Sequence, residues 1–238
     1  MLHGKQRGIF DLEFCIPAVC ADRLAAGTAD IGIVPSFELT RQDLETIPGA
    51  GIACRGAVRS ILLVSKCPAA QIRTLAADSS SRTSVRLARV ILERKYGAVV
   101  DPIPHPPELE AMLKSADAAL VIGDPALRID PERLPYQTYD LGAEWVGMTG
   151  LPMVFAVWAG RPGVAIPEIE AAFRDSWHYG RDHMDDIVAA ETEARGFDAA
   201  LVRDYLTHHI VHELGDREYV GMRLFLEYAR TGHLAQIR

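Results

Sequence analysis

Two short stretches decide the fold of this chain, namely ADIGIVPS at residues 29–36 and AALVIGD at residues 118–124. Each is an apolar run that stops abruptly at small or polar residues, which is typical of a buried parallel strand ending in a ligand-facing loop. Ligands of open α/β sheets bind just beyond such strand ends. Because the two endings are well separated in the sequence, we predict two lobes that share one cleft.

The segments around these stretches alternate between strand-like and helix-like patterns, which indicates the α/β class. Further strands are predicted over residues 12–16, 51–55, 58–65, 72–76, 99–103 and 151–158. Helices are predicted over residues 17–27, 39–44, 84–96 and 107–114, and from residue 167 onward. The apolar runs 58–65 and 151–158 are similar, and we expect them to be the two crossings between the lobes. One lobe then combines residues 1–66 with 150–238, the other is 67–149, and a hinge joins them.

The composition limits the classes of partner. The chain has 238 residues, of which 49% are hydrophobic and 24% charged, as in an ordinary soluble globular protein. Its net charge is −7 without a run of Lys or Arg, so we expect no nucleic-acid partner. The four cysteines form no CxxC pair and are expected to be reduced and buried. Without a signal-peptide pattern or a membrane-length apolar stretch, we expect a cytoplasmic protein that binds no membrane.

Residues 78–84 are the best candidate for binding an anion. A helix N-terminus presents unpaired N–H groups and a partial positive charge. Ser81, Thr83 and Ser84 add hydroxyl groups there, and Arg82 adds a full charge. The alternative is that one of these hydroxyls simply caps the helix, as happens at many helix starts.

Three further positions allow a chemical interpretation and a structural one. Ser36 either binds a carboxylate or begins the next helix. Asp124 either takes part in acid–base chemistry or caps the short helix 125–127. His208 and His212 share a helical face, but they lack the HExxH order and a third ligand. We therefore expect a histidine-bearing surface helix and no metal.

Four motifs occur together, and their order is more specific than any one of them. They are ADIGIVPSFE at 29–38, SRTS at 81–84, VIGDPAL at 121–127 and DLGxxWxxMTGLPxVFA at 140–156. This combination resembles the menaquinone-biosynthesis family of the futalosine route, from about residue 9 to the C-terminus. The resemblance implies a type II periplasmic-binding-protein fold, with two α/β lobes around a central cleft, in a cytosolic enzyme.

The family resembled has two branches, and one residue separates them. The branch that cleaves cyclic dehypoxanthine futalosine carries a catalytic His at the end of the strand matching 118–122, where this chain has Gly123 and then Asp124. The pattern is similar to the chorismate dehydratase branch. The resemblance implies a small dicarboxylate substrate with contacts at Ser36, Thr83 and Ser84, which match substrate-contact positions of the family. From their positions in this sequence we add Ser81, Arg82 and Thr149 as candidate substrate contacts. Asp124, the only well-placed side-chain carboxylate, is a candidate catalytic group.

The implied reaction is loss of water from chorismate to give 3-[(1-carboxyvinyl)oxy]benzoate. Aromatisation of the ring drives this elimination, so the resemblance implies neither a metal nor a redox cofactor. It also allows a carboxylate of the substrate to act as the base. The alternative from another functional class is a non-catalytic solute-binding protein for a small carboxylate, because a fold does not fix a function.

The chain departs from the family at its N-terminus. The family begins with a strand whose loop places an Asn in the active site, whereas Met1 falls where the following helix is already under way. We therefore expect the chain as given to be a weak catalyst or none, and an N-terminal extension that supplies this strand to restore activity.

Overall fold

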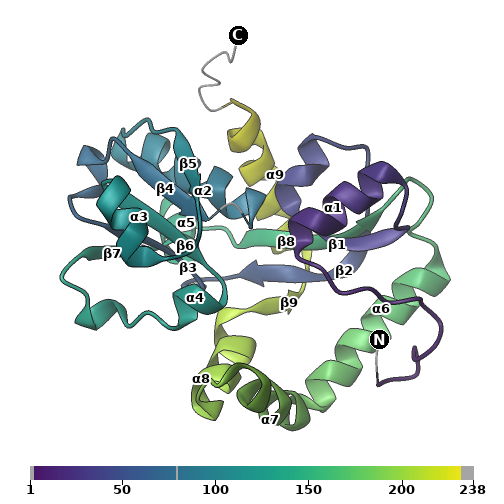
Figure 1. The fold of residues 1–238 in the computed structure, drawn as a ribbon. Coiled ribbons are helices and arrows are strands. Elements are labelled where there is room, and N and C mark those ends of the chain that lie inside the picture. The colour runs from purple at the N-terminus through teal and green to yellow at the C-terminus, as the bar shows by residue number, and fades with distance from the viewer. Residues whose placement is uncertain (1–2, 79, 232–238) are drawn as a thin grey trace.

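The computed structural model describes residues 3–78 and 80–231, whose strands form two sheets with helices packed around them (Figure 1). The first sheet has the order β1-β8-β2-β9 and the second the order β5-β4-β6-β3-β7. The first comprises β1 (Ile31–Pro35), β2 (Glu45–Cys54), β8 (Met153–Gly160) and β9 (Val211–Glu213). The second comprises β3 (Ile61–Ser65), β4 (Leu75–Asp78), β5 (Pro102–His105), β6 (Ala118–Ile122) and β7 (Gln137–Asp140). The fold is therefore α/β with two lobes, as predicted.

The helices begin and end close to the positions that the sequence predicts. Pro17 opens the first helix, and glycines with positive φ end several of them, as at Gly27 and Gly97. The α-helices are α1 (Pro17–Ala26), α2 (Arg82–Tyr96), α3 (Leu109–Ser115), α4 (Asp124–Leu127), α5 (Leu141–Thr149), α6 (Pro167–Asp182), α7 (Met184–Arg195), α8 (Ala199–Asp204) and α9 (Asp216–Thr231). Shorter turns are the 3-10 helices η1 (Ser36–Thr40), η2 (Ala69–Gln71) and η3 (Pro131–Arg133), and the π-helix η4 (Tyr205–His209).

Strand direction differs from the prediction. β1 pairs with β8 in antiparallel fashion, so the expectation of a parallel strand there is wrong. β6 is parallel to β4 on one side and antiparallel to β3 on the other. An apolar run indicates that a strand is buried on both faces of its sheet. A strand buried in this way can be parallel or antiparallel to its neighbours, so the run does not predict its direction. The helix predicted over 39–44 is likewise replaced by η1, which begins directly after β1.

The predicted strand at residues 12–16 is not formed. Residues 11–16 are extended but unpaired, and Leu12, Phe14 and Ile16 are exposed. A cavity of about 390 Å³, which we call cavity 1, lies between this segment and β1, the edge strand of the first sheet. A strand needs a neighbour for its backbone groups, and none of the described strands lies beside this segment.

The lobes are connected through loops rather than through the predicted strands. β3 lies wholly in the second sheet and β8 wholly in the first, so the crossings are residues 55–60 and 150–152. Asp140, the N-cap of α5, holds the first crossing by accepting hydrogen bonds from the N–H groups of Val58 (2.9 Å) and Arg59 (2.6 Å). Arg59 has a φ of +67°, an uncommon backbone conformation that these bonds stabilise.

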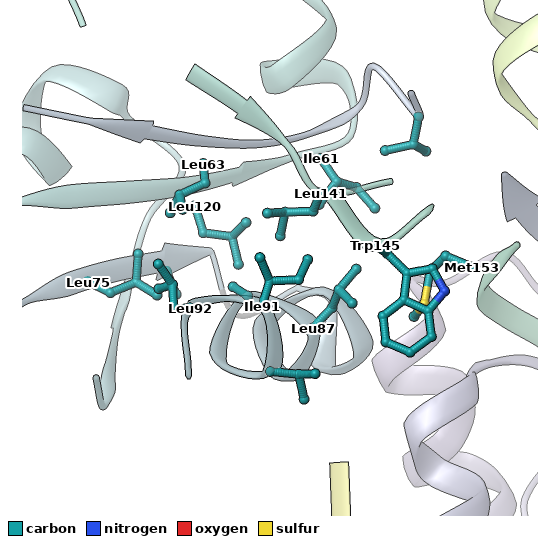
Figure 2. Close-up of a cluster of buried hydrophobic side chains, with 14 of the residues drawn as sticks. Ile61, Leu63, Leu75, Leu87, Ile91, Leu92, Leu120, Leu141, Trp145 and Met153 are labelled. Atoms are coloured by element: carbon teal, nitrogen blue, oxygen red, sulfur yellow. The ribbon is translucent and has the colours of Figure 1, made fainter. Parts of the chain in front are cut away.

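One apolar core runs through both lobes. Figure 2 shows Leu87 and Ile91 of α2 beside the strands of the second sheet, with Trp145 of α5 and Met153 of β8 in the same cluster. Phe225 of α9 completes it, with its ring edge-on to Trp145. Helix α9 contacts β8, η1 and α2, and therefore packs against elements of both lobes (Figure 1).

We predict that Asp140→Ala lowers the free energy of unfolding by about 2–3 kcal/mol, because three backbone N–H groups lose one acceptor. The third is that of Ala143, at 3.0 Å. The measurement is urea unfolding, with Asp130→Ala as control. Asp130 also caps a helix, but it accepts a single backbone bond, from Glu132, and is more exposed. An equally small loss in both variants would contradict this role.

A second prediction concerns pH and Glu218 of α9, which is 1% exposed and pairs with Arg55 of the first crossing at 2.8 Å. Burial raises the pKa of Glu218, but hydrogen bonds from Arg55 and the Gly215 N–H outweigh it, and the pKa lies below the ordinary 4.5. Its stabilisation is therefore complete above pH 4.5 and is lost as the pH falls through the lowered folded-state pKa.

Urea unfolding of the wild type and Glu218→Gln across this range tests the assignment. The difference in unfolding free energy should be largest near neutral pH and should shrink in acid. A difference that does not change with pH would show that the carboxylate contributes through shape alone.

Candidate functional site

The lobes meet where η1 touches the N-terminus of α2, a place we call the junction. Ser36 donates to the carbonyl of Val154 in β8 at 2.7 Å, and its Oγ lies 3.4 Å from Oγ1 of Thr83. The N–H of Phe37 donates to the same Thr83 oxygen at 3.2 Å. Ser36 and Thr83 are fully buried. The structure thus brings together two of the predicted site residues, from strand-end and helix-start positions in different lobes.

The first turn of α2 explains why these hydroxyls are held in place. Ser81 is the N-cap and accepts the N–H of Ser84 at 3.3 Å, and the two side-chain oxygens lie 2.9 Å apart. Ser81 therefore has the capping role that was the alternative to anion binding. The buried carboxylate of Asp78 accepts the N–H of Ser80 at 2.9 Å, which fixes the loop before the helix.

Arg82 joins the lobes through ion pairs. Its guanidinium binds Glu38 of η1 at 3.1 Å and both carboxylate oxygens of Asp22 in α1 at 2.8 and 3.0 Å. Hydrogen bonding to Asp22, followed by that to Glu38, raises the pKa of Arg82. Glu38 is 1% exposed and also accepts from Arg41 and Gln42. A substrate contact of Arg82 stays a prediction, and it requires the guanidinium to leave Asp22.

Asp124 lies apart from the junction. It lines a cavity of about 350 Å³, here called cavity 2, together with apolar residues of α7 and α8. Its carboxylate accepts from Arg195 at 2.8 Å, and Arg195 also pairs with Glu191. Neither Ser36 nor Thr83 lines this cavity. The structure therefore does not bring Asp124 into contact with the other predicted residues.

Thr149 and the histidines have structural partners. Thr149 donates to the carbonyl of Trp145 at 2.8 Å and accepts the N–H of Leu151 at 3.2 Å, which orders the second crossing. His208 and His209 both bond to Asp204. His212 lies in β9, beside the ring of Trp177, so the expectation that His208 and His212 share a helical face is wrong. Over residues 3–78 and 80–231, no three His, Cys, Asp or Glu side chains are arranged to hold a metal. None of the described helices is both long and apolar enough to cross a bilayer.

Sequence reasoning missed Arg86, one turn after Thr83 on α2. Its guanidinium lies 5.2 Å from the centre of the Phe37 ring and donates to the carbonyl of Ala229 at 2.9 Å. Burial, and then repulsion from Arg89, lower the pKa of Arg86, so this is a partly desolvated cation. The i, i+3 spacing from Thr83 was the available signal, because such residues share a helical face.

Tyr205 was also missed. Burial raises its pKa, and its hydroxyl donates to Ser60 of the first crossing at 3.0 Å. It also lines cavity 2, so this one side chain contacts both the first crossing and the cavity. No spacing or motif in the sequence marks it, because the contact depends on tertiary structure.

Relatives of known structure share the fold. A protein of Archaeoglobus fulgidus matches with a TM-score of 0.69 at 16% identity, covering 91% of this chain and 84% of its own. A Candida albicans gene product with the generic periplasmic binding protein fold matches with a TM-score of 0.57 at 11% identity, covering 92% and 79%. The alkanesulfonate-binding protein of Xanthomonas axonopodis gives 0.56 at 13% identity, covering 93% and 83%. At these identities the matches show the fold alone.

Sequence comparison is more specific. A chorismate dehydratase of Thermus thermophilus is 29% identical over 236 residues, which cover 92% of this chain and 86% of that protein. The profile of a family described as menaquinone biosynthesis matches residues 6–231, nearly the whole chain. With the two-lobe fold and the buried hydroxyls at the junction already in place, this match establishes that the chain belongs to the menaquinone-biosynthesis family.

Proposed function

We propose that this chain is a chorismate dehydratase, a lyase that converts chorismate into 3-[(1-carboxyvinyl)oxy]benzoate. The similarity to the Thermus thermophilus chorismate dehydratase over 92% of the chain carries this proposal. Gly123 supports it further. Its φ is +70°, a conformation that disfavours a side chain, at the position where the resemblance puts the catalytic His of the other branch.

The reaction needs orientation and exclusion of water more than it needs strong acids or bases. A proton leaves the ether-bearing carbon, the neighbouring C–O bond breaks, and the hydroxyl departs as water while the ring becomes aromatic. We propose that the hydroxyls of Ser36 and Thr83 bind a substrate carboxylate or the departing hydroxyl. Arg86, whose guanidinium lies over the ring of neighbouring Phe37, adds positive charge in a partly desolvated setting, where a charge–carboxylate attraction is strong.

Substrate entry then requires the junction to separate. The hydroxyls of Ser36 and Thr83 lie within hydrogen-bonding distance of each other across the lobes, and Thr83 also accepts the N–H of Phe37. Both side chains are fully buried, so no ligand can reach them in this arrangement. We propose that the lobes move about the two crossings and close again on chorismate. Closure removes water from the reacting groups, which favours elimination over side reactions.

We predict that Thr83→Val weakens chorismate binding by roughly 10- to 100-fold, because a hydrogen bond to a charged group is worth about 1.5–3 kcal/mol. Thr83→Ser keeps the hydroxyl and should bind within about threefold of the wild type. Calorimetric titration gives the affinity, and circular dichroism confirms folding. Ser115→Ala is the control, because Ser115 is an exposed serine at the end of α3.

Turnover distinguishes the enzyme from its alternative. The chain is incubated with chorismate, and the loss of chorismate and formation of the benzoate product are followed by chromatography. Formation of the product by the wild type, with much less product from Thr83→Val, supports the proposal. Tight chorismate binding without any product would favour a solute-binding protein, and equal turnover by Thr83→Val would remove Thr83 from the site.

We propose Asp124 as the acid–base group, from its place directly after β6 and among the residues that line cavity 2. Because Asp124 lies apart from the junction in this arrangement, this role requires the lobe movement to bring it to the bound substrate. Asp124→Asn should then lower kcat by about 100-fold and remove one limb of the pH profile, since general acid–base catalysis contributes about 10²–10⁴. Arg195→Met is the matched variant, because it leaves the carboxylate but removes its ion pair. A kcat within threefold of the wild type in Asp124→Asn would assign the reaction to substrate-assisted proton transfer instead.

A further inference from the structure

Two thiols face each other at cavity 1. The Sγ atoms of Cys15 and Cys20 lie 3.1 Å apart. Both side chains line cavity 1, and both residues are partly exposed, unlike the buried Cys54. The expectation that all four cysteines are buried is therefore wrong for this pair and for Cys67, which is also partly exposed.

The local sequence explains why the thiols meet. Ile16 is the N-cap of α1 and Pro17 its first residue, so Cys20 lies in the first turn of the helix. Side chains of a helix lean toward its N-terminus, which directs Cys20 back toward the residue before the cap. Helix α1 packs closely on β1. The closeness is seen at Gly32, where an added Cβ would lie 3.2 Å from the Cβ of Cys20. The helix therefore holds Cys20 against the extended segment that carries Cys15.

We propose that Cys15 and Cys20 are a dithiol site that reacts with low-molecular-weight disulfides to form an intramolecular disulfide bond. A disulfide requires an S–S distance of about 2.05 Å, so the sulfur atoms need to approach by about 1 Å. Cys15 lies in the unpaired segment 11–16, which has no strand hydrogen bonds to break. Cavity 1 gives a small oxidant a route to the sulfur atoms.

The two thiols have different parts in the reaction. Burial, and then the hydrogen bond with Cys15, raise the pKa of Cys20 to about 12, so Cys20 stays protonated while Cys15 attacks first. The Cys15 thiolate displaces one thiolate from the oxidant, breaking its S–S bond and forming a mixed disulfide. Cys20 then loses its proton and attacks the Cys15 sulfur, releasing the second thiolate. Two electrons and the two protons of the protein thiols end on the two small thiols released.

The product would join the unpaired segment 11–16 to α1 by a covalent bond. This segment presents Phe14, which is 80% exposed, and the disulfide would tie Cys15, near its end, to the helix. This consequence is independent of the proposed dehydratase chemistry, because neither thiol belongs to the junction.

Peptide mapping provides the test. The full chain is incubated with glutathione disulfide, alkylated without reduction and digested with trypsin. The tryptic peptide 8–23 contains both thiols, whereas Cys54 and Cys67 fall in separate peptides. We expect the unalkylated 8–23 peptide to appear about 2 Da lighter, as formation of one disulfide requires. It should accumulate to at least about ten times the level of any adduct at Cys67, because the neighbouring thiol closes the mixed disulfide in an intramolecular step.

Variants make the result specific. Cys20→Ser should leave Cys15 as a stable mixed disulfide with glutathione, because the resolving thiol is gone. Cys67→Ser is the matched control, since Cys67 is also partly exposed but its neighbour is the hydroxyl of Ser65, and it should not change the 8–23 result. Stable glutathione adducts on wild-type Cys15, a disulfide between two chains, or full alkylation of both thiols would each overturn the proposal.

Discussion

The hydroxyl of Thr83 is the contact on which the arrangement of the site depends. It accepts the Phe37 N–H from the other lobe at 3.2 Å and lies 3.4 Å from the Ser36 hydroxyl, which is itself bound to a carbonyl of β8. A buried N–H without an acceptor is costly, so this bond favours the closed arrangement. The same oxygen is a good partner for a carboxylate. If Thr83 binds the substrate carboxylate as proposed, closure and ligand binding depend on the same oxygen atom and are therefore coupled.

The rest of the molecule limits how the lobes can separate. The apolar core is continuous from the second sheet through Trp145 and Phe225 into α9, so a wide opening would expose a large apolar surface. Asp140 and Thr149 order the two crossings with hydrogen bonds to backbone groups. A small rotation about the two crossings would break the polar contacts at the junction and would expose less of this apolar core than a wide opening. The core therefore favours a small hinge motion over separation of the whole interface.

Much of this could be predicted from the sequence, and the failures have physical causes. Helices α1 and α2 follow from Pro17, a serine cap and glycine stops, all of which act locally. The approach of Ser36 to Thr83 follows from one strand-end and one helix-start position in the sequence. The direction of the strands relative to one another does not follow from the sequence, because β1 and β6 are apolar whichever way their neighbours run. Arg82 carries the right charge for an anion site, but only the folded chain shows Glu38 and Asp22 already bound to it.

Amide hydrogen exchange at Phe37 tests the central claim most directly, because this N–H reports on the contact between the lobes. The amides of β3, a fully buried strand in the second sheet, report on global unfolding. If the junction opens to admit substrate, Phe37 exchanges faster than β3 without ligand. Chorismate at about 100 times its Kd should then slow exchange at Phe37 by roughly 100-fold. Exchange at Phe37 as slow as in β3, and unchanged by chorismate, would contradict the account.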